Sequence, residues 1–172
     1  MTFPADESQG PATKWTEYPG DGYTANFTEG VFVGYRWYDA NNQQPLFPFG
    51  HGLSYTTFRY DTLQVQSSGD SATVKVRVTN TGTRAGAEVA QLYVEFPPES
   101  LEPPRQLKGF DKVMLKPGES KTVTFPLDRS ALSAWDEAAH EWKLYPGSYT
   151  AQVGSSSRDL RAKGIFSIGR LP

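Results

Sequence analysis

Apolar side chains alternate with polar ones in several short runs after residue 57, and this pattern constrains the fold more than any other feature. Val74, Val76 and Val78 alternate with polar or charged neighbours, and similar runs follow at residues 123–127 and 149–153. Successive side chains of a β-strand point to opposite faces of a sheet. Each run therefore predicts a strand that buries one face and exposes the other.

Turn-forming residues separate these runs at intervals of about 8–12 residues, which is typical of an all-β sandwich. The predicted turns at residues 67–70, 80–83, 116–119 and 145–148 each contain a glycine. No segment has the length and periodicity of an amphipathic helix. The sequence thus predicts an immunoglobulin-like β-sandwich of seven or eight strands over residues 57–172, with its last strand ending at Ile168.

Three segments of this region have a less regular pattern. Prolines exclude an interior strand at residues 97–104. One or two strands are expected at residues 107–115, and a short helical turn is expected at residues 130–137. The third segment is the strand predicted at residues 88–96, before the prolines. Its core face is predicted to carry Ala90, Leu92, Val94 and Phe96, and its polar face to carry Glu88, Gln91 and Glu95.

A dense aromatic segment precedes the predicted sandwich, and we call residues 30–58 the junction. Val31–Tyr38 looks strand-like, so that Trp37 and Tyr38 are expected to face opposite ways. A polar turn follows at residues 39–42, and two prolines at 45–49 keep the next stretch extended. Gly50-His51-Gly52 predicts a sharp bend. So many aromatic side chains are expected to pack against a large surface.

The remaining composition excludes several classes of function. Lysine and arginine number 17 and aspartate and glutamate 19, which gives a net charge of −2 and argues against a nucleic-acid or membrane partner. There is no cysteine, so disulfides and thiolate metal sites are excluded. No stretch approaches the roughly 18 apolar residues of a membrane helix. Residues 1–29 lack periodicity and are expected to be irregular.

Long motifs in the junction and the sandwich carry a family resemblance. They are GVFVGYRWYD at residues 30–39, PLFPFGHGLSYTTF at 45–58, TNTGTRAGAEVAQLYV at 79–94, PPRQLKGF at 103–110, LKPGESKTVTFPL at 115–127, SAWD at 133–136 and YPGSYTAQVGSSSRDL at 145–160. In this order they resemble the C-terminal part of glycoside hydrolase family 3 β-glucosidases. The resemblance covers nearly the whole chain and only that part of the family.

The resemblance implies a fibronectin type III-like sandwich behind a junction that links it to the family's second catalytic domain. Residues 1–29 then form the tail end of an absent catalytic domain, residues 30–56 an aromatic linker that makes up most of the junction, and residues 57–172 the sandwich. Thr2-Phe3-Pro4 is similar to the end of the family's second catalytic domain, so we expect the parent protein to start upstream of Met1. The family resemblance favours a secreted or periplasmic protein, and we expect a bacterial source.

The chain shows no constellation for catalysis. Glycoside hydrolysis needs two carboxylates at a defined separation, and the acids here lie mostly in turns or on polar strand faces. The resemblance implies that the nucleophile and the acid/base lie in the absent domains, so no catalytic residue is predicted. His51 and His140 are the only histidines and lack further ligands nearby in sequence. We therefore predict no metal and no cofactor.

The candidate interface with the absent domains lies in the junction. Its predicted members are Tyr35, Arg36, Trp37, Tyr38, Asp39, Phe47, Phe49, His51 and Tyr55. Arg36 and Asp39 are expected to make charge-assisted bonds with another domain or to form a solvated pair. For all four tryptophans a core or interface role is favoured: Trp135 is expected to cap the core and Trp142 to lie on a sheet face. Trp15 and Trp37 are weaker candidates for stacking on a sugar ring.

Three functions remain open from the sequence. The leading hypothesis is a non-catalytic domain that braces the catalytic domains of a β-glucosidase, because its aromatic, proline-stiffened junction differs from a Gly/Ser-rich tether. The second is a module that binds polysaccharide or a cell-wall polymer, which an exposed row of tryptophan and tyrosine would favour. The third is a separate subunit that completes a split glycosidase, which a native start at Met1 would favour.

Overall fold

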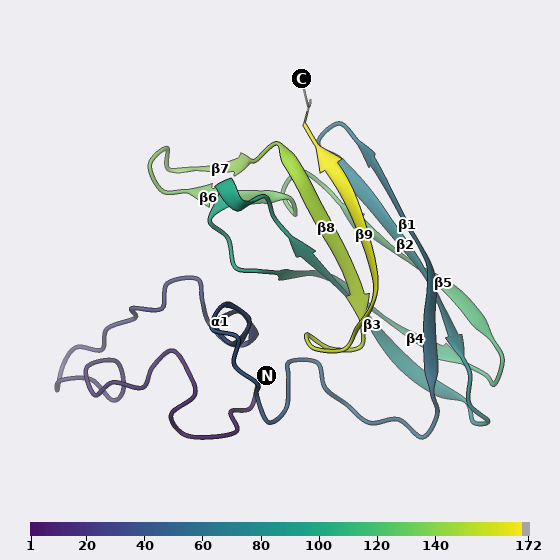
Figure 1. Cartoon of the computed structure of the whole chain (residues 1–172), viewed down its shortest axis with the longest axis horizontal. Coiled ribbons are helices and arrows are strands. Elements are labelled where there is room, and N and C mark those ends of the chain that lie inside the picture. Colours follow the sequence, from purple (N-terminus) through teal and green to yellow (C-terminus); the bar gives the residue numbers. More distant parts are fainter. Residues whose placement is uncertain (170–172) are drawn as a thin grey trace.

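The computed structural model describes residues 1–169 of the chain as a two-layered β-sandwich with a long N-terminal extension (Figure 1). The last predicted residues of the sandwich, 170–172, lie outside the described part. One layer has three strands in the order β1-β2-β5: β1 is Phe58–Ser68, β2 is Ser71–Asn80 and β5 is Ser120–Leu127. The other layer has the order β4-β3-β8-β9: β3 is Gly86–Glu95, β4 is Gln106–Leu115, β8 is Gly147–Gly154 and β9 is Leu160–Ile168.

The two layers bury the alternating apolar residues that the sequence predicts. Val74, Val76 and Val78 on β2 have no exposed surface, and neither have Leu92 and Val94 on β3. All the neighbouring strands pair antiparallel, and Val76 lies opposite Val123 of β5. The all-β sandwich is confirmed, with seven strands in its two layers.

A separate hairpin at the edge of the sandwich corrects the expectation for residues 130–137. Ser133–Asp136 forms strand β6, which pairs with β7 at Glu141–Leu144. A turn precedes β6, in which the backbone N–H of Leu132 donates to the carbonyl of Asp128. The predicted helical turn is thus wrong from Ser133 onward. The hairpin raises the number of strands in the described chain to nine, two more than the sandwich itself contains.

Trp135 and Trp142 lie on this hairpin. They are opposite one another in register, with ring centroids 5.7 Å apart and nearly perpendicular planes. Trp135 is almost half exposed and Trp142 is more so, and neither is in the core cluster. Trp135 therefore does not cap the core, because β6 pairs with β7 instead of covering the open end of the sandwich.

The three segments with a less regular sequence pattern form different structures. Residues 106–115 form the single strand β4, and the proline-rich loop contains only a short 3-10 turn, η1, at Pro98–Ser100. On β3, Gln91 points away from the core as predicted, but Glu88 lies on the core side. The prediction for Glu88 is wrong because residues 88, 90 and 92 have the same parity and must share a face.

The junction contains a helix where a strand was predicted. Tyr35–Ala40 forms α1, which follows Gly34 at φ 55° and precedes Asn42 at φ 49°. The strand prediction failed because aromatic residues have only a moderate intrinsic preference against helix, which tertiary contacts override. In a helix, residues 35, 38 and 39 share one face. That face is the one that packs, as Tyr38 is buried and the carboxylate of Asp39 has no exposed surface.

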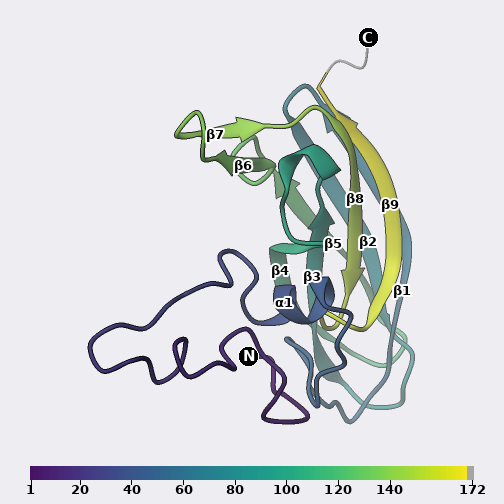
Figure 2. The ribbon, with the colours of Figure 1, turned by 60° about the vertical axis from the view of Figure 1, so that its left-hand side comes forward.

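Residues 1–33 extend away from the sandwich on the side of α1 (Figure 2). Several of their aromatic side chains are largely exposed, namely Trp15, Tyr18, Tyr23 and Phe27. Local bonds order parts of the segment: Glu17 is buried, accepts a hydrogen bond from Thr28 and pairs with Lys14 at 3.6 Å. No helix in the described residues is long and apolar enough to cross a membrane.

Candidate functional site

Tyr35 holds the junction to the outer face of the four-stranded sheet. Its hydroxyl accepts a hydrogen bond of 2.8 Å from the backbone N–H of Leu107 on β4. Its ring meets Tyr93 of β3 edge-on at 5.7 Å and lies 5.3 Å from Phe49. Aromatic pairs with these separations contribute about 0.5–1.5 kcal/mol each beyond the burial of their area. Tyr35 and Phe49 therefore cover β3 on the side opposite the core.

A buried ion cluster fixes α1 from its other end. The Nε of Arg105 donates to Asp39 Oδ2 at 2.8 Å, and Arg158 lies 3.2 Å from Oδ1 as an ion pair without the alignment of a hydrogen bond. Arg158 also donates to the carbonyl of Gln43 at 2.7 Å. Burial raises the pKa of Asp39, and the two guanidinium groups oppose this shift. Asp39 thus bonds to the chain's own sandwich, which replaces the expected bond to another domain or a solvated pair with Arg36.

Of the other predicted members of α1, Tyr38 contacts the N-terminal segment. Trp37 is half-buried and packs edge-on against Tyr38 at 5.2 Å. The hydroxyl of Tyr38 is 3.4 Å from the carbonyl of Gln9, to which it donates. Arg36 is half-buried, and Trp15 remains exposed on its own loop. The two predicted sugar-stacking residues, Trp15 and Trp37, are therefore in different surroundings.

The second half of the junction leaves several large side chains in contact with solvent. Phe47 packs edge-on against Phe3 at 6.2 Å and lies 5.3 Å from His51, yet remains nearly half exposed. Leu53 is 95% exposed and Tyr55 is 93% exposed. We call Leu46, Phe47, Leu53 and Tyr55 the outer face of the junction. The predicted interface residues thus fall into two sets. Tyr35, Asp39 and Phe49 pack on the sandwich, whereas Phe47 and Tyr55 belong to the outer face.

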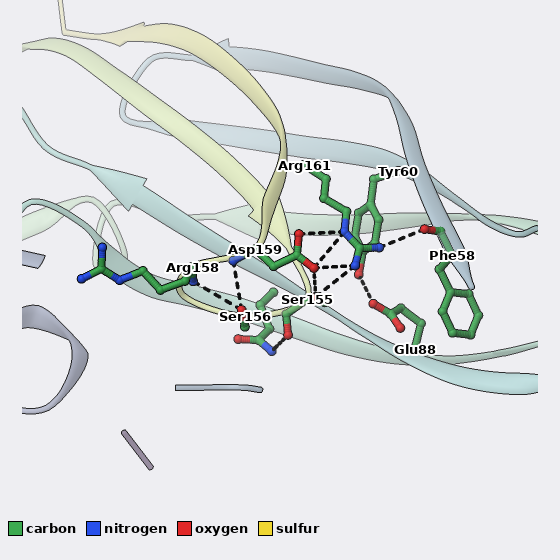
Figure 3. Close-up of polar contacts among 9 residues, drawn as sticks. Phe58, Tyr60, Glu88, Ser155, Ser156, Arg158, Asp159 and Arg161 are labelled. Carbon is green, nitrogen blue, oxygen red and sulfur yellow. Dashed lines mark hydrogen bonds and ion pairs between the residues drawn. The ribbon is translucent and has the colours of Figure 1, made fainter. Parts of the chain in front are cut away.

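A polar pocket lies where the junction meets the loop between β8 and β9. It has a volume of about 340 Å³, and its wall includes His51, Leu53, Phe58, Glu88 and Ser155. The loop adds Asp159, and the start of β9 adds Arg161 (Figure 3). Gly154 permits the tight path of this loop, since a Cβ there would lie 1.8 Å from the carbonyl oxygen of Asp159.

Arg161 organises the rim of the pocket. Its Nε donates to the carboxylate of Asp159 at 3.0 Å, and NH1 donates to the carbonyl of Phe58 at 2.9 Å. Its guanidinium lies over the ring of Tyr60, 5.1 Å from the centroid (Figure 3). The hydrogen bond from Arg161 lowers the pKa of Asp159. Arg161 therefore ties β9 to the start of β1 across the pocket.

Glu88 is the buried acid of the pocket. The hydroxyl of Tyr60 donates to Oε1 of Glu88 at 2.7 Å. The side chain of Glu88 lies on the same face of β3 as Ala90, Leu92 and Val94, which belong to the core. Burial raises the pKa of Glu88, and the bond from Tyr60 opposes the shift. Burial likewise raises the pKa of Tyr60.

Sequence reasoning missed four charged residues that build these contacts: Glu88, Arg105, Arg158 and Arg161. One signal was available, because the parity of residue 88 places it on the core face of β3. The arginines lie on loops or near strand ends, where local pattern does not indicate a partner. In residues 1–169, no group of three or more histidine, aspartate or glutamate side chains is arranged to hold a metal ion.

Comparison with known proteins identifies the domain. Residues 88–157 match the family model described as a fibronectin type III-like domain. The chain is 46% identical over 166 residues to the probable β-glucosidase D of Aspergillus flavus, covering 84% of this chain and 22% of the relative. It is 43% identical to the thermostable β-glucosidase B of Acetivibrio thermocellus, covering 94% of this chain and 22% of the relative.

Solved structures agree over the whole architecture. The β-glucosidase DesR from Streptomyces venezuelae, solved in complex with D-glucose, superposes with a TM-score of 0.93 at 42% identity, covering 98% of this chain and 22% of that chain. The GH3 β-glucosidase of Bifidobacterium adolescentis superposes with a TM-score of 0.92 at 39% identity, covering all of this chain and 26% of that chain. This chain carries the fibronectin type III-like domain of the family 3 β-glucosidases.

The fibronectin type III-like domain accounts for only part of those proteins. The chain spans about a fifth of the length of the curated relatives that it matches. The matched part is the non-catalytic domain of these enzymes. The coverage extends through the junction as well as the sandwich, because nearly the entire chain superposes on both solved structures.

Proposed function

We propose that this chain is a non-catalytic domain that braces the catalytic part of a larger β-glucosidase-type protein. The observation that carries the proposal is the two-sided junction. Its inner side is bonded to the sandwich through Tyr35 and Asp39, while its outer face exposes Leu53 and Tyr55 almost completely. The relatives support the nature of the partner, because in them the domain is one part of a longer β-glucosidase.

The physical advantage of this arrangement is preorganisation. A flexible segment loses conformational freedom when it docks, and this loss weakens binding. The ion cluster around Asp39 and the two prolines at 45 and 48 restrain the junction before any partner is present. Burial of its exposed apolar side chains then stabilises the assembly by about 25 cal/mol for each Å² removed from water. Apolar side chains as exposed as Leu53 and Tyr55 are available for such a contact.

The test compares outer-face variants in the isolated chain and in the larger protein that includes the catalytic part. L53A and Y55A should leave the melting temperature of the isolated chain unchanged, because both side chains are exposed there. In the larger protein they should lower the melting temperature by several degrees and change the turnover of an aryl β-glucoside much less. L101A, at a largely exposed leucine of the proline-rich loop outside the junction, serves as an apolar control.

The opposite pattern would contradict the bracing role. A collapse of turnover with unchanged thermal stability would assign the outer face to the active site. Unchanged stability and unchanged turnover would show that the outer face remains in solvent in the larger protein.

A further inference from the structure

The polar pocket between the junction and the β8–β9 loop has an unbalanced charge. Three charged side chains contribute to its wall: Glu88, Asp159 and Arg161. Asp159 and Arg161 pair with one another, and Arg161 also donates to the carbonyl of Phe58 (Figure 3). The acid that remains is Glu88, which lies within the electrostatic influence of Arg161 but forms no ion pair with it or with another cation in residues 1–169.

Glu88 is poorly satisfied for a carboxylate in its position. Its side chain is only 9% exposed, and its single hydrogen bond within residues 1–169 comes from Tyr60 to Oε1. Oε2 accepts no hydrogen bond there and retains some exposed surface, and Glu88 lines the pocket. A buried carboxylate with one neutral donor is costly unless a cation or further donors complete it.

The shape of the pocket restricts what can complete Glu88. A volume of about 340 Å³ is enough for a long side chain, and Leu53 and Phe58 provide an apolar wall beside the polar one. A lone carboxylate provides too few ligands for a metal ion, which takes several oxygen ligands at short distance. An arginine or lysine fits both walls, because its aliphatic stem packs on apolar surface while its charged end bonds to an acid.

We propose that this pocket receives the guanidinium or ammonium group of a basic side chain from the catalytic part against which the domain packs. This inference rests on the proposed function and adds the chemistry of one contact. Leu53 connects the two, since it belongs both to the pocket wall and to the exposed outer face of the junction. A partner that covers the outer face therefore lies beside the pocket entrance. Buried arginine anchors of this kind contribute strongly to protein interfaces.

The first experiment probes the isolated chain with small ligands. N-acetyl-arginine methylamide is titrated into the ¹⁵N-labelled 172-residue chain, and N-acetyl-citrulline methylamide is the neutral isostere. The arginine compound should shift the amide signals of Leu53, Glu88 and Ser155 in a saturable way, and the citrulline compound should not. E88Q should weaken this binding at least about tenfold, whereas D70N, at an exposed acid on a distant turn, should not.

Two outcomes of this titration overturn the proposal. Equal binding of the arginine and citrulline compounds would show that the pocket does not select a cation. Unchanged binding in E88Q would show that the cation binds elsewhere. A folded E88Q chain is required for either conclusion, and its amide spectrum provides that check in the same experiment.

The second experiment identifies the source of the cation. In the larger protein, E88Q should lower the melting temperature although it leaves the isolated chain as stable as the wild type or more so. If L53A and Y55A destabilise the larger protein and E88Q does not, the pocket proposal fails and the bracing function stands. If none of the three has an effect, the bracing function fails as well. The arginine compound could bind the isolated chain while E88Q has no effect on the larger protein. This result would show that the pocket binds a free cation, and it would overturn the proposal that the cation comes from the catalytic part.

Discussion

At the residue scale, a few charged side chains decide how the junction is attached. Asp39 has no exposed surface, and its partners Arg105 and Arg158 are about one-fifth exposed. Removing one member of a buried pair costs more than the pair contributes, because the remaining charge loses its partner. This differs from the exposed pair of Arg129 and Asp70, which solvent screens.

The variant R105A should therefore destabilise the isolated chain by about 1–3 kcal/mol. It leaves the buried carboxylate of Asp39 with Arg158 as its remaining cation and loosens α1 from the sheet. Urea unfolding measures the difference, and R129A, which removes the cation of the exposed pair, should change the free energy of unfolding by less than about 0.5 kcal/mol. Equal stability of R105A and R129A would show that the ion cluster does not hold the junction.

The raised pKa of Glu88 makes the free energy of unfolding depend on pH. Burial raises its pKa above the ordinary value of 4.5, so the folded state binds its proton more tightly than the unfolded state. The resulting stabilisation is fully present below the ordinary pKa and is lost as pH rises through the raised one. Wild type should thus lose stability relative to E88Q between about pH 4.5 and neutral pH. Urea unfolding of both proteins over this range tests the sign.

Asp159 provides a comparison of opposite sign. The hydrogen bond from Arg161 lowers its pKa, so its contribution is present above the ordinary pKa of 3.8 and is lost as pH falls. D159N should therefore be less stable than the wild type at neutral pH, and the difference should shrink on acidification. Parallel curves for E88Q and D159N would contradict both assignments.

At the scale of the elements, β2 forms the centre of the three-stranded layer. It pairs with β1 on one side and β5 on the other, and its inward valines meet Leu92 and Val94 of the opposite layer in one core cluster. An unpaired charge in this position has no donor or counterion nearby and loses its hydration.

V76D should accordingly unfold the chain or destabilise it by several kcal/mol. K75D provides a matched control, because Lys75 is the preceding residue of the same strand and faces solvent. Thermal melting followed by circular dichroism distinguishes the two variants. If V76D melts with K75D, the face assignment of β2 is wrong.

At the scale of the whole molecule, the sandwich and the N-terminal part differ in how they are stabilised. The sandwich has a continuous core between two sheets, whereas residues 1–33 project from it with exposed aromatic side chains (Figures 1 and 2). The junction lies between them and contacts the sandwich mainly through Tyr35, Asp39 and Phe49.

We therefore propose that residues 57–172 fold without the preceding segment. The core is complete within this range, so the shortened chain should retain a dispersed amide spectrum. Its melting temperature should be lower by roughly 5–15 °C, because Arg105 and Arg158 lose Asp39 and the outer side of Tyr93 becomes exposed. A collapsed spectrum would show that the junction is an integral part of the domain.

The sequence by itself determined the all-β sandwich and the inward valines of β2. These follow from the alternation of side chains along a strand, which is a property of neighbouring residues. Strict application of the same rule also places Glu88 on the core face of β3. The aromatic density of residues 30–58 also indicated a packing segment, but not which of its side chains pack.

Only the tertiary structure decided the helix α1, the hairpin β6–β7 and the two charged clusters. Residues 35–40 become helical because Tyr35 and Asp39, one turn apart, meet β3, β4 and the β8–β9 loop together. Asp39 and Arg105 are 66 residues apart in the chain, and Glu88 meets Tyr60 across 28. Contacts at such separations depend on how the sheets bring distant segments side by side, and no local pattern of side chains encodes the pairing.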